Sequence, residues 1–217
     1  MSLAVLTDFD DTAAFQNVAE LLLNKFGGPS WMDIRGRFRS GELTLKEYQE
    51  ITFRNILADR SQMWDYVKQH ASFRPHFGEV WQHCNKYNYP MAIVSQGLDF
   101  YIEALLEKYG FDQIPVYAVN TEFSPEGLRY EYTFTYPDDP ERGNSKGLIV
   151  NRFQDKGYKV IYIGDGRSDF EAAVEADEVF AHSVLAKECQ QQGIPFRPFS
   201  DFGAVIELLR TYSREGS

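Results

Sequence analysis

Three carboxylates stand close together near the start of the chain, at Asp8, Asp10 and Asp11. They directly follow the apolar run Leu3–Thr7. Like charges a few ångströms apart repel and raise one another's pKa, so such a cluster usually persists when a cation neutralises it. A hard divalent ion with oxygen ligands, most naturally Mg2+, is the implied partner. The alternative is that the three aspartates are turn residues that cap the next helix.

A second acidic group repeats this construction further along the chain. The apolar run Val160–Ile163 leads through Gly164 to Asp165, and Asp169 follows at the opening of a predicted helix. In a parallel α/β sheet two such strand ends can converge, which predicts that Asp8 and Asp165 hold one metal ion between them. Asp169 would then steady metal-bound water.

Two further segments offer hydrogen-bond donors and positive charge for a phosphate group. The stretch Ser95–Gly97 follows the apolar run that begins at Met91, so the Ser95 hydroxyl and the turn amides could hold phosphate oxygens. Lys146 stands at a predicted helix start, where its charge could neutralise substrate and aspartates. Serine-glycine turns and surface lysines are common, so a purely structural role stays open for each.

The elements that would position these residues alternate between strand and helix. Short apolar runs predict buried parallel strands at Leu3–Thr7, Met91–Ser95, Val160–Ile163 and Glu178–Ala181. Helical periodicity follows them at Phe100–Tyr109, Ser145–Asp155, Asp169–Ala176 and Val184–Gln192. This order predicts an α/β fold with a doubly wound, Rossmann-like parallel sheet.

Two segments interrupt that alternation. About 80 residues between the first and second predicted strands show helical periodicity, at Asn17–Phe26, Leu45–Leu57 and Gln62–His70. Residues 116–136 alternate around a Ser-Pro-Glu-Gly turn and predict a β-hairpin. We therefore expect an α/β core formed by residues 1–14 and 80–217, with a helical cap over residues 15–79.

Composition narrows the classes of partner. The chain has 217 residues and a mass of 25.0 kDa, and 22 basic against 32 acidic residues give a net charge of −10. Such a surface repels phosphate backbones, which argues against nucleic acid and anionic membranes as partners. No apolar run reaches the roughly 18 to 20 residues of a membrane span, and we expect a cytoplasmic protein. Cys84 and Cys189 are interpreted as free thiols.

The four segments, in this order, resemble the motifs of the haloacid dehalogenase (HAD) superfamily of aspartate-nucleophile phosphohydrolases. The matching segments are Asp8–Thr12, Ser95, Lys146 and Gly164–Asp169. The resemblance implies that Asp8 attacks phosphorus to form an aspartyl-phosphate, and that Asp10 protonates the leaving oxygen and then activates water. It assigns Mg2+ to the carboxylates of Asp8 and Asp165 and to the backbone carbonyl of Asp10. It assigns the phosphate group of a small phosphorylated metabolite to Ser95, Gln96, Gly97 and Lys146.

The helical insertion resembles the subclass whose helical lid selects the substrate. Within it, the chain is most similar to the phosphoserine phosphatase and methylthio-ketopentenyl-phosphate phosphatase group, and more to the second, which implies a 2-hydroxy-3-keto-5-methylthiopentenyl-1-phosphate phosphatase-like activity with phosphoserine phosphatase as the alternative. Phosphoserine phosphatases carry a glutamate nine residues after the nucleophile, where this chain has Asn17. Asp11 also departs from the family, which often has glycine there. The cysteines that salvage enzymes often carry before the lysine are absent between Asn120 and Lys146.

Other functions use similar residues. A receiver-like phosphoacceptor module, which is not an enzyme, also combines aspartates, Mg2+ and a lysine, but needs no lid of about 80 residues. A dehalogenase would have no use for Asp10 as an acid, whereas a mutase would keep both aspartates.

Arginines at 35, 37 and 39 alternate along the lid, so most of them are expected to be solvated. The oligomeric state is left open.

Overall fold

The computed structural model describes residues 2–125, 127–140 and 143–215. Within them, a seven-stranded sheet has the order β4-β3-β2-β1-β5-β6-β7. The strands are β1 (Leu3–Thr7), β2 (Met91–Leu98), β3 (Val116–Ser124), β4 (Gly127–Glu131), β5 (Lys159–Gly164), β6 (Glu178–Ala181) and β7 (Arg197–Pro198). The strands pair in parallel apart from the antiparallel β3 and β4.

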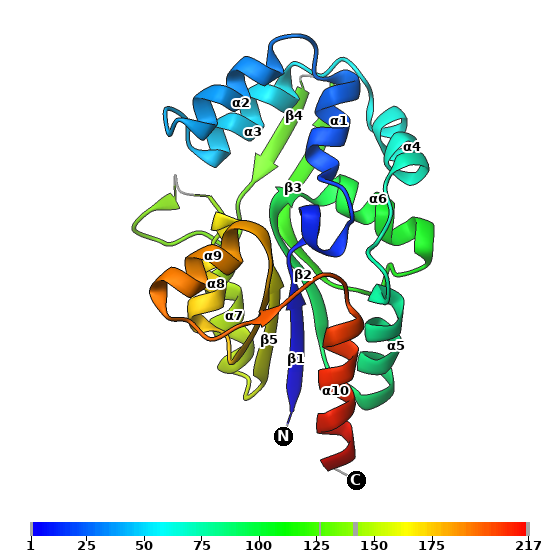
Figure 1. Cartoon of the computed structure of the whole chain (residues 1–217). Coiled ribbons are helices and arrows are strands. Elements are labelled where there is room, and N and C mark those ends of the chain that lie inside the picture. The colour runs from blue at the N-terminus through cyan, green and yellow to red at the C-terminus, as the bar shows by residue number, and fades with distance from the viewer. Residues whose placement is uncertain (1, 126, 141–142, 216–217) are drawn as a thin grey trace.

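Helices cover both faces of this sheet (Figure 1). One face carries α5 (Phe77–Tyr87), α6 (Asp99–Tyr109) and α10 (Gly203–Glu215), and the other carries α7 (Lys146–Gln154), α8 (Phe170–Glu175) and α9 (Ser183–Gln192). Side chains of β1 alternate between the two apolar clusters, with Leu3 and Val5 in one and Ala4 and Leu6 in the other. A strand buried on both sides reads as a continuous apolar run, which is why β1 was predictable. The predicted doubly wound α/β fold is confirmed.

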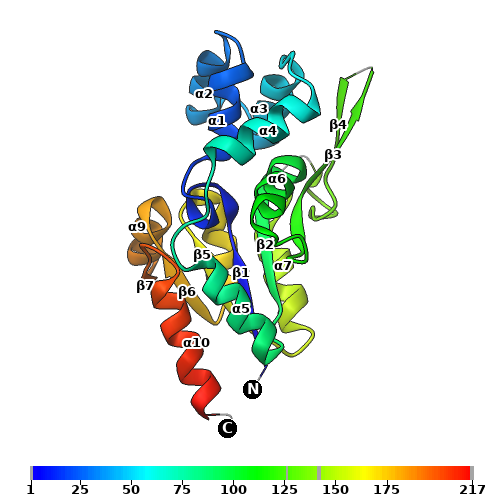
Figure 2. The same cartoon turned by 90° about the vertical axis from the view of Figure 1, so that its right-hand side faces the viewer.

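Four helices form a separate layer beyond the carboxyl end of β1 (Figure 2). They are α1 (Val18–Phe26), α2 (Trp31–Arg39), α3 (Leu45–Arg54) and α4 (Arg60–His70). Capping boxes start α3 at Thr44 and α4 at Asp59. The predicted cap of residues 15–79 contains all four, but its end falls inside α5, and the division into two domains stays a prediction.

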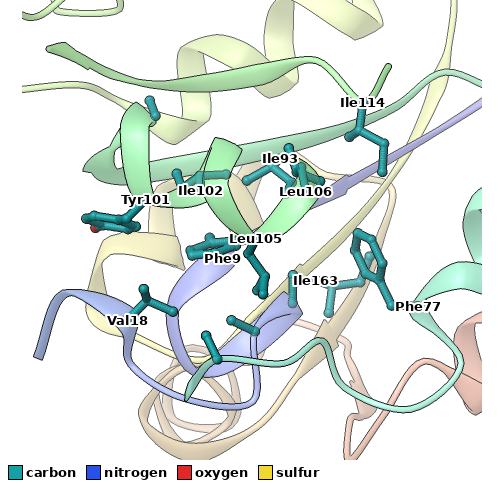
Figure 3. Packing of buried hydrophobic residues seen from close by; sticks show 14 of the residues in the cluster. Phe9, Val18, Phe77, Ile93, Tyr101, Ile102, Leu105, Leu106, Ile114 and Ile163 are labelled. Atoms are coloured by element: carbon teal, nitrogen blue, oxygen red, sulfur yellow. The ribbon is translucent and has the colours of Figure 1, made fainter. Parts of the chain in front are cut away.

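The chain enters and leaves this layer through two adjacent segments. The Phe15 amide donates to the Ser72 carbonyl at 2.8 Å, and the Arg74 amide donates to the Ala13 carbonyl at 2.9 Å. One apolar cluster continues from the sheet into the cap layer, and Figure 3 shows Phe9, Tyr101 and Val18 of α1 within it. The cap layer is therefore joined to the carboxyl end of β1 by packing as well as by the chain.

Several element boundaries differ from the sequence prediction. The helix predicted to reach Leu57 ends at Arg54, and the hairpin ends at Glu131 rather than at residue 136. Glu126, in the predicted hairpin turn, lies outside the described residues. The sequence prediction gave no bounds for α2, because its nine residues include a glycine and three arginines that obscure the apolar periodicity.

Candidate active site

The sheet register brings the predicted acidic and phosphate-binding segments to one edge. Thr7 lies opposite Ile93 of β2 and opposite Ile163 of β5, so the residues that follow these strands lie side by side. The Asp8 amide donates to the Ile163 carbonyl at 2.8 Å. A cleft of about 270 Å3 at this edge is lined by Asp8, Asp10, Ser95, Gln96, Gly97, Lys146 and Asp165. The structure therefore brings the predicted residues together; Asp169 does not line the cleft itself but contacts Lys146 beside it.

Lys146 forms a buried bridge between two carboxylates. Its Nζ lies 2.6 Å from Oδ1 of Asp8 and 2.6 Å from Oδ1 of Asp169. Ser145 caps α7 by accepting a hydrogen bond from the Leu148 amide, which fixes the helix that carries the lysine. Burial opposes the charge, but Asp169 and Asp8 raise the pKa of Lys146 above its usual range. The ammonium group is therefore charged at neutral pH.

The charge of Lys146 alone does not balance the carboxylates at this edge. Burial, and then the charge of Asp169, raise the pKa of Asp8 well above its usual value despite Lys146. Burial and Asp169 likewise raise the pKa of Asp165 to about 6. Ligand oxygens of Asp8, Asp165 and Asp169 lie within 4.8 Å of one another. Such a cluster fits a hard divalent cation, which would supply the missing charge.

The hydrogen bonds show which carboxylates are free to bind a cation. Oδ1 of Asp169 accepts from Lys146 and from the Tyr162 hydroxyl, and Oδ2 accepts from the amides of Asp165 and Gly166. Oδ1 of Asp165 accepts from the Thr12 hydroxyl at 3.0 Å. With both oxygens of Asp169 engaged, Asp8 and Asp165 are the better direct ligands and Asp169 holds their surroundings.

The carboxylate of Asp10 points away from this acidic group. Its Oδ1 accepts from the amides of Val18 and Ala19 at the start of α1, at 2.6 and 3.3 Å, and its Oδ2 accepts from the Tyr101 hydroxyl at 3.1 Å. Burial raises the pKa of Asp10 to about 6, although these donors oppose the shift. A carboxyl with a pKa near neutrality suits proton transfer, and any bond from Asp10 to a cation would have to come from its backbone carbonyl.

The strand predicted to end at Ser95 continues to Leu98, so Ser95, Gln96 and Gly97 lie in the last part of β2, which is compact because of the glycine. The Gly97 amide donates to Oγ of Ser95 at 2.9 Å. A side chain at Gly97 would place its Cβ 2.0 Å from the Tyr101 hydroxyl. Only glycine at position 97 therefore allows this segment of β2 to approach Tyr101, the tyrosine that contacts Asp10. The sequence offers no local signal for Tyr101, Thr12 or Tyr162, whose partners are distant along the chain or depend on side-chain direction.

Asp11 occupies a left-handed backbone conformation, with φ of 59°. Glycine adopts this conformation without cost, and aspartate tolerates it better than most residues. The Asp11 carbonyl accepts from Arg74 at 2.6 Å and contacts Nε2 of His182 at 3.1 Å. Its carboxylate accepts from Nδ2 of Asn17 at 3.1 Å. These contacts hold the turn that carries Asp8 and Asp10.

The cap forms the remaining wall of the cleft. Arg35 and Arg39 lie on the cleft side of α2, whereas Arg37 pairs with Glu42. Arg35 forms an ion pair with Glu20. Aromatic and aliphatic side chains complete this wall, namely Phe38, Leu45, Tyr48 and Phe53. Two of the three lid arginines therefore face the cleft, whereas their alternate spacing predicted that most of them would be solvated.

Comparison with known proteins agrees with this geometry. The family model of haloacid dehalogenase-like hydrolases matches residues 5–173. The chain belongs to this family. It is 29% identical over 215 residues to a 2-hydroxy-3-keto-5-methylthiopentenyl-1-phosphate phosphatase of Exiguobacterium sibiricum, covering 97% of this chain and 98% of the relative. A protein of the same name from Brevibacillus brevis is 27% identical, covering 98% of this chain and 97% of that protein.

Solved structures of similar fold include phosphoserine phosphatases. A phospho-aspartyl intermediate analogue of phosphoserine phosphatase superposes with a TM-score of 0.70 at 17% identity, covering 95% of this chain and 98% of that one. A probable phosphoserine phosphatase from Vibrio cholerae gives a TM-score of 0.73 at 16% identity, covering 97% of this chain and 64% of that one. The predicted superfamily and the predicted enzyme class, a HAD-type phosphatase, are confirmed. No helix in the described part of the chain is long and apolar enough to cross a membrane.

Proposed function

We propose that the protein is a Mg2+-dependent phosphomonoesterase of small metabolites in which Asp8 is the nucleophile and Asp10 the general acid and base. The buried contact of Lys146 with Asp8 and Asp169, beside a third carboxylate of raised pKa, is the observation that carries the proposal. Asp8 and Asp165 would hold the ion, with the Asp10 carbonyl. When bound, Mg2+ would neutralise the phosphate charge that otherwise repels the nucleophile.

The residues of the chain divide the reaction into two steps. A carboxylate oxygen of Asp8 forms a bond to phosphorus while the ester bond breaks, and protonated Asp10 gives its proton to the leaving alcohol. Water then attacks the aspartyl-phosphate, Asp10 takes the proton, and inorganic phosphate leaves with Asp8 restored. Ser95, the amides of Gln96 and Gly97, and Lys146 would hold the transferred oxygens.

We propose 2-hydroxy-3-keto-5-methylthiopentenyl-1-phosphate as the substrate type. The relatives that carry this name match the whole length of the chain. The apolar side chains on the cap wall suit an uncharged methylthio tail. Phosphoserine is the alternative, supported by the structural neighbours. Its ammonium group would need a free carboxylate, yet Glu20 is already paired with Arg35.

The decisive experiment measures inorganic phosphate released from a panel of phosphate monoesters, with Mg2+ and after exhaustive chelation. We expect turnover with Mg2+, no turnover after chelation, and restoration on adding Mg2+ back. A receiver-like module would take up one phosphate without turnover, and a mutase would return it to product rather than to water. Activity that survives chelation would refute the metal assignment. A cytoplasmic location belongs to the same proposal.

A further inference from the structure

Gln49 is a buried side chain of the cap that the reaction above leaves without a role. It lies on α3 with 7% of its surface exposed, beside Tyr48 and Phe53, and it lines the cleft. Burying a carboxamide costs free energy unless its polar atoms find partners. The partners of its nitrogen and of its oxygen therefore indicate what this residue does.

The amide nitrogen of Gln49 is hydrogen-bonded to the segment of β2 that carries Ser95. Nε2 of Gln49 donates to the backbone carbonyl of Gln96 at 2.6 Å. A carbonyl can only accept, so the nitrogen must face this segment and the orientation of the amide is determined. The Gln96 side chain in turn donates to the Asn144 carbonyl at 2.7 Å, two residues before Lys146. The cap is thus anchored between both predicted phosphate-binding segments.

The amide oxygen is left as a fixed acceptor. Among the residues that the structure describes, none donates a hydrogen bond to Oε1 of Gln49, and this oxygen is not among the buried atoms that lack a partner, so solvent reaches it. Two other polar residues on the cap side, Asn17 and Glu20, are occupied. Both side-chain atoms of Asn17 are engaged, and Glu20 is paired with Arg35. Because Gln49 is hydrogen-bonded to the residue that follows Ser95, a substrate donor that reaches Oε1 would lie near the phosphate ester.

We infer that Gln49 is a specificity-determining residue whose Oε1 accepts a hydrogen bond from a substrate hydroxyl on the carbon next to the ester carbon. The substrate class is then the β-hydroxyalkyl or enol phosphates. This inference rests on the proposed phosphatase function, and it assigns a residue to the hydroxyl that the proposed substrate type carries next to its ester carbon. A bound substrate without the hydroxyl covers this acceptor and leaves it unpaired, which is the basis of strong discrimination between otherwise equal molecules.

The test compares 2-hydroxypropyl phosphate with n-propyl phosphate, which differ only in that hydroxyl. With Mg2+, we expect wild-type kcat/KM to favour the hydroxylated probe by about tenfold. In Gln49→Met the preference falls below about twofold. Loss of the anchor to Gln96 lowers both rates together, whereas loss of the acceptor changes their ratio, so the ratio is the readout.

Two further variants separate these effects. Gln49→Glu keeps an acceptor of the same reach but cannot donate to Gln96, so both rates fall while the preference survives. Gln154→Met is the matched control, because its Nε2 donates to the Glu175 carbonyl at 2.7 Å on an exposed part of α7. It should keep wild-type rates and preference. Circular dichroism melting checks that each variant is folded.

The outcomes that overturn the inference are distinct from failure of the proposed function. Equal rates for the two probes in the wild type would contradict it. So would a lost preference in Gln49→Glu, which would assign the effect to the anchor. Preference lost in Tyr48→Phe but kept in Gln49→Met would move the role to the neighbouring hydroxyl. If the wild type released no phosphate from either probe or from p-nitrophenyl phosphate, the proposed function itself would be wrong.

Discussion

Asp165→Asn should stabilise the metal-free protein in a way that depends on pH. Burial and Asp169 raise the pKa of Asp165 from 3.8 to about 6. A carboxyl whose pKa is raised by folding contributes stability that is fully present below pH 3.8 and lost as the pH rises through 6. Each pKa unit corresponds to about 1.4 kcal/mol, so ionised Asp165 costs the folded protein about 3 kcal/mol at pH 7.

The asparagine removes this cost with little other change. Its Oδ1 can still accept from the Thr12 hydroxyl, and the backbone contacts of residue 165 are unaffected. We expect the free energy of unfolding of variant and wild type to agree within about 0.5 kcal/mol at pH 4. At pH 7 the variant should be more stable by about 3 kcal/mol, with chelator present.

Urea denaturation at intervals from pH 4 to 8 measures this difference. Asp155→Asn, an exposed position at the end of α7, controls for the loss of one formal charge. Adding Mg2+ should stabilise the wild type, because binding to the folded state alone shifts the equilibrium. The variant should gain much less. A difference that does not change with pH, or equal gains from Mg2+, would refute the convergence of Asp8 and Asp165 on one cation.

Three further predictions concern turnover. Asp8→Asn should fold normally but lose activity on the order of 10^3-fold or more, because an amide cannot form the acyl-phosphate; a tenth of wild-type activity would contradict this. Asp10→Asn should slow alkyl phosphates by about 10^2-fold or more and spare p-nitrophenyl phosphate, whose leaving group needs no proton; equal losses would argue against the acid. Asn17→Glu should gain phosphoserine activity only when it is combined with Asp11→Gly. If the effects of the two substitutions on kcat/KM for phosphoserine simply added in the double variant, this prediction would be wrong.

The strands and the catalytic edge were predictable because their signals are local. A strand buried on both faces is a continuous apolar run, so β1 and β6 have the bounds that the sequence predicts. Asp8 and Asp165 follow such strands directly, and Ser95–Gly97 lie in the last part of β2, so parallel pairing brings these residues together. Their place at one edge therefore follows from sequence pattern and topology alone.

The contacts that could not be predicted from the sequence depend on side-chain direction and on partners that are distant along the chain. Tyr101 contacts Asp10 across 91 positions, and Gln49 reaches Gln96 across 47. Neither residue type is unusual where it stands. The Asp10 carboxylate also points toward α1 rather than toward Asp8, a choice set by the free amides at a helix start. Spacing along one chain contains no information on these contacts.

Two departures from the family pattern prove to be in contact. Asp11 replaces a frequent glycine, and Asn17 replaces the glutamate of phosphoserine phosphatases. Nδ2 of Asn17 donates to Oδ2 of Asp11, while its Oδ1 caps α1 through the Glu20 amide. A glutamate at 17 would place a second carboxylate against Asp11, where like charges repel. The aspartate therefore requires a neutral donor at 17, and that donor leaves no free carboxylate there for a substrate ammonium group. Substrate selection and the conformation of the catalytic turn are thus linked through this one hydrogen bond.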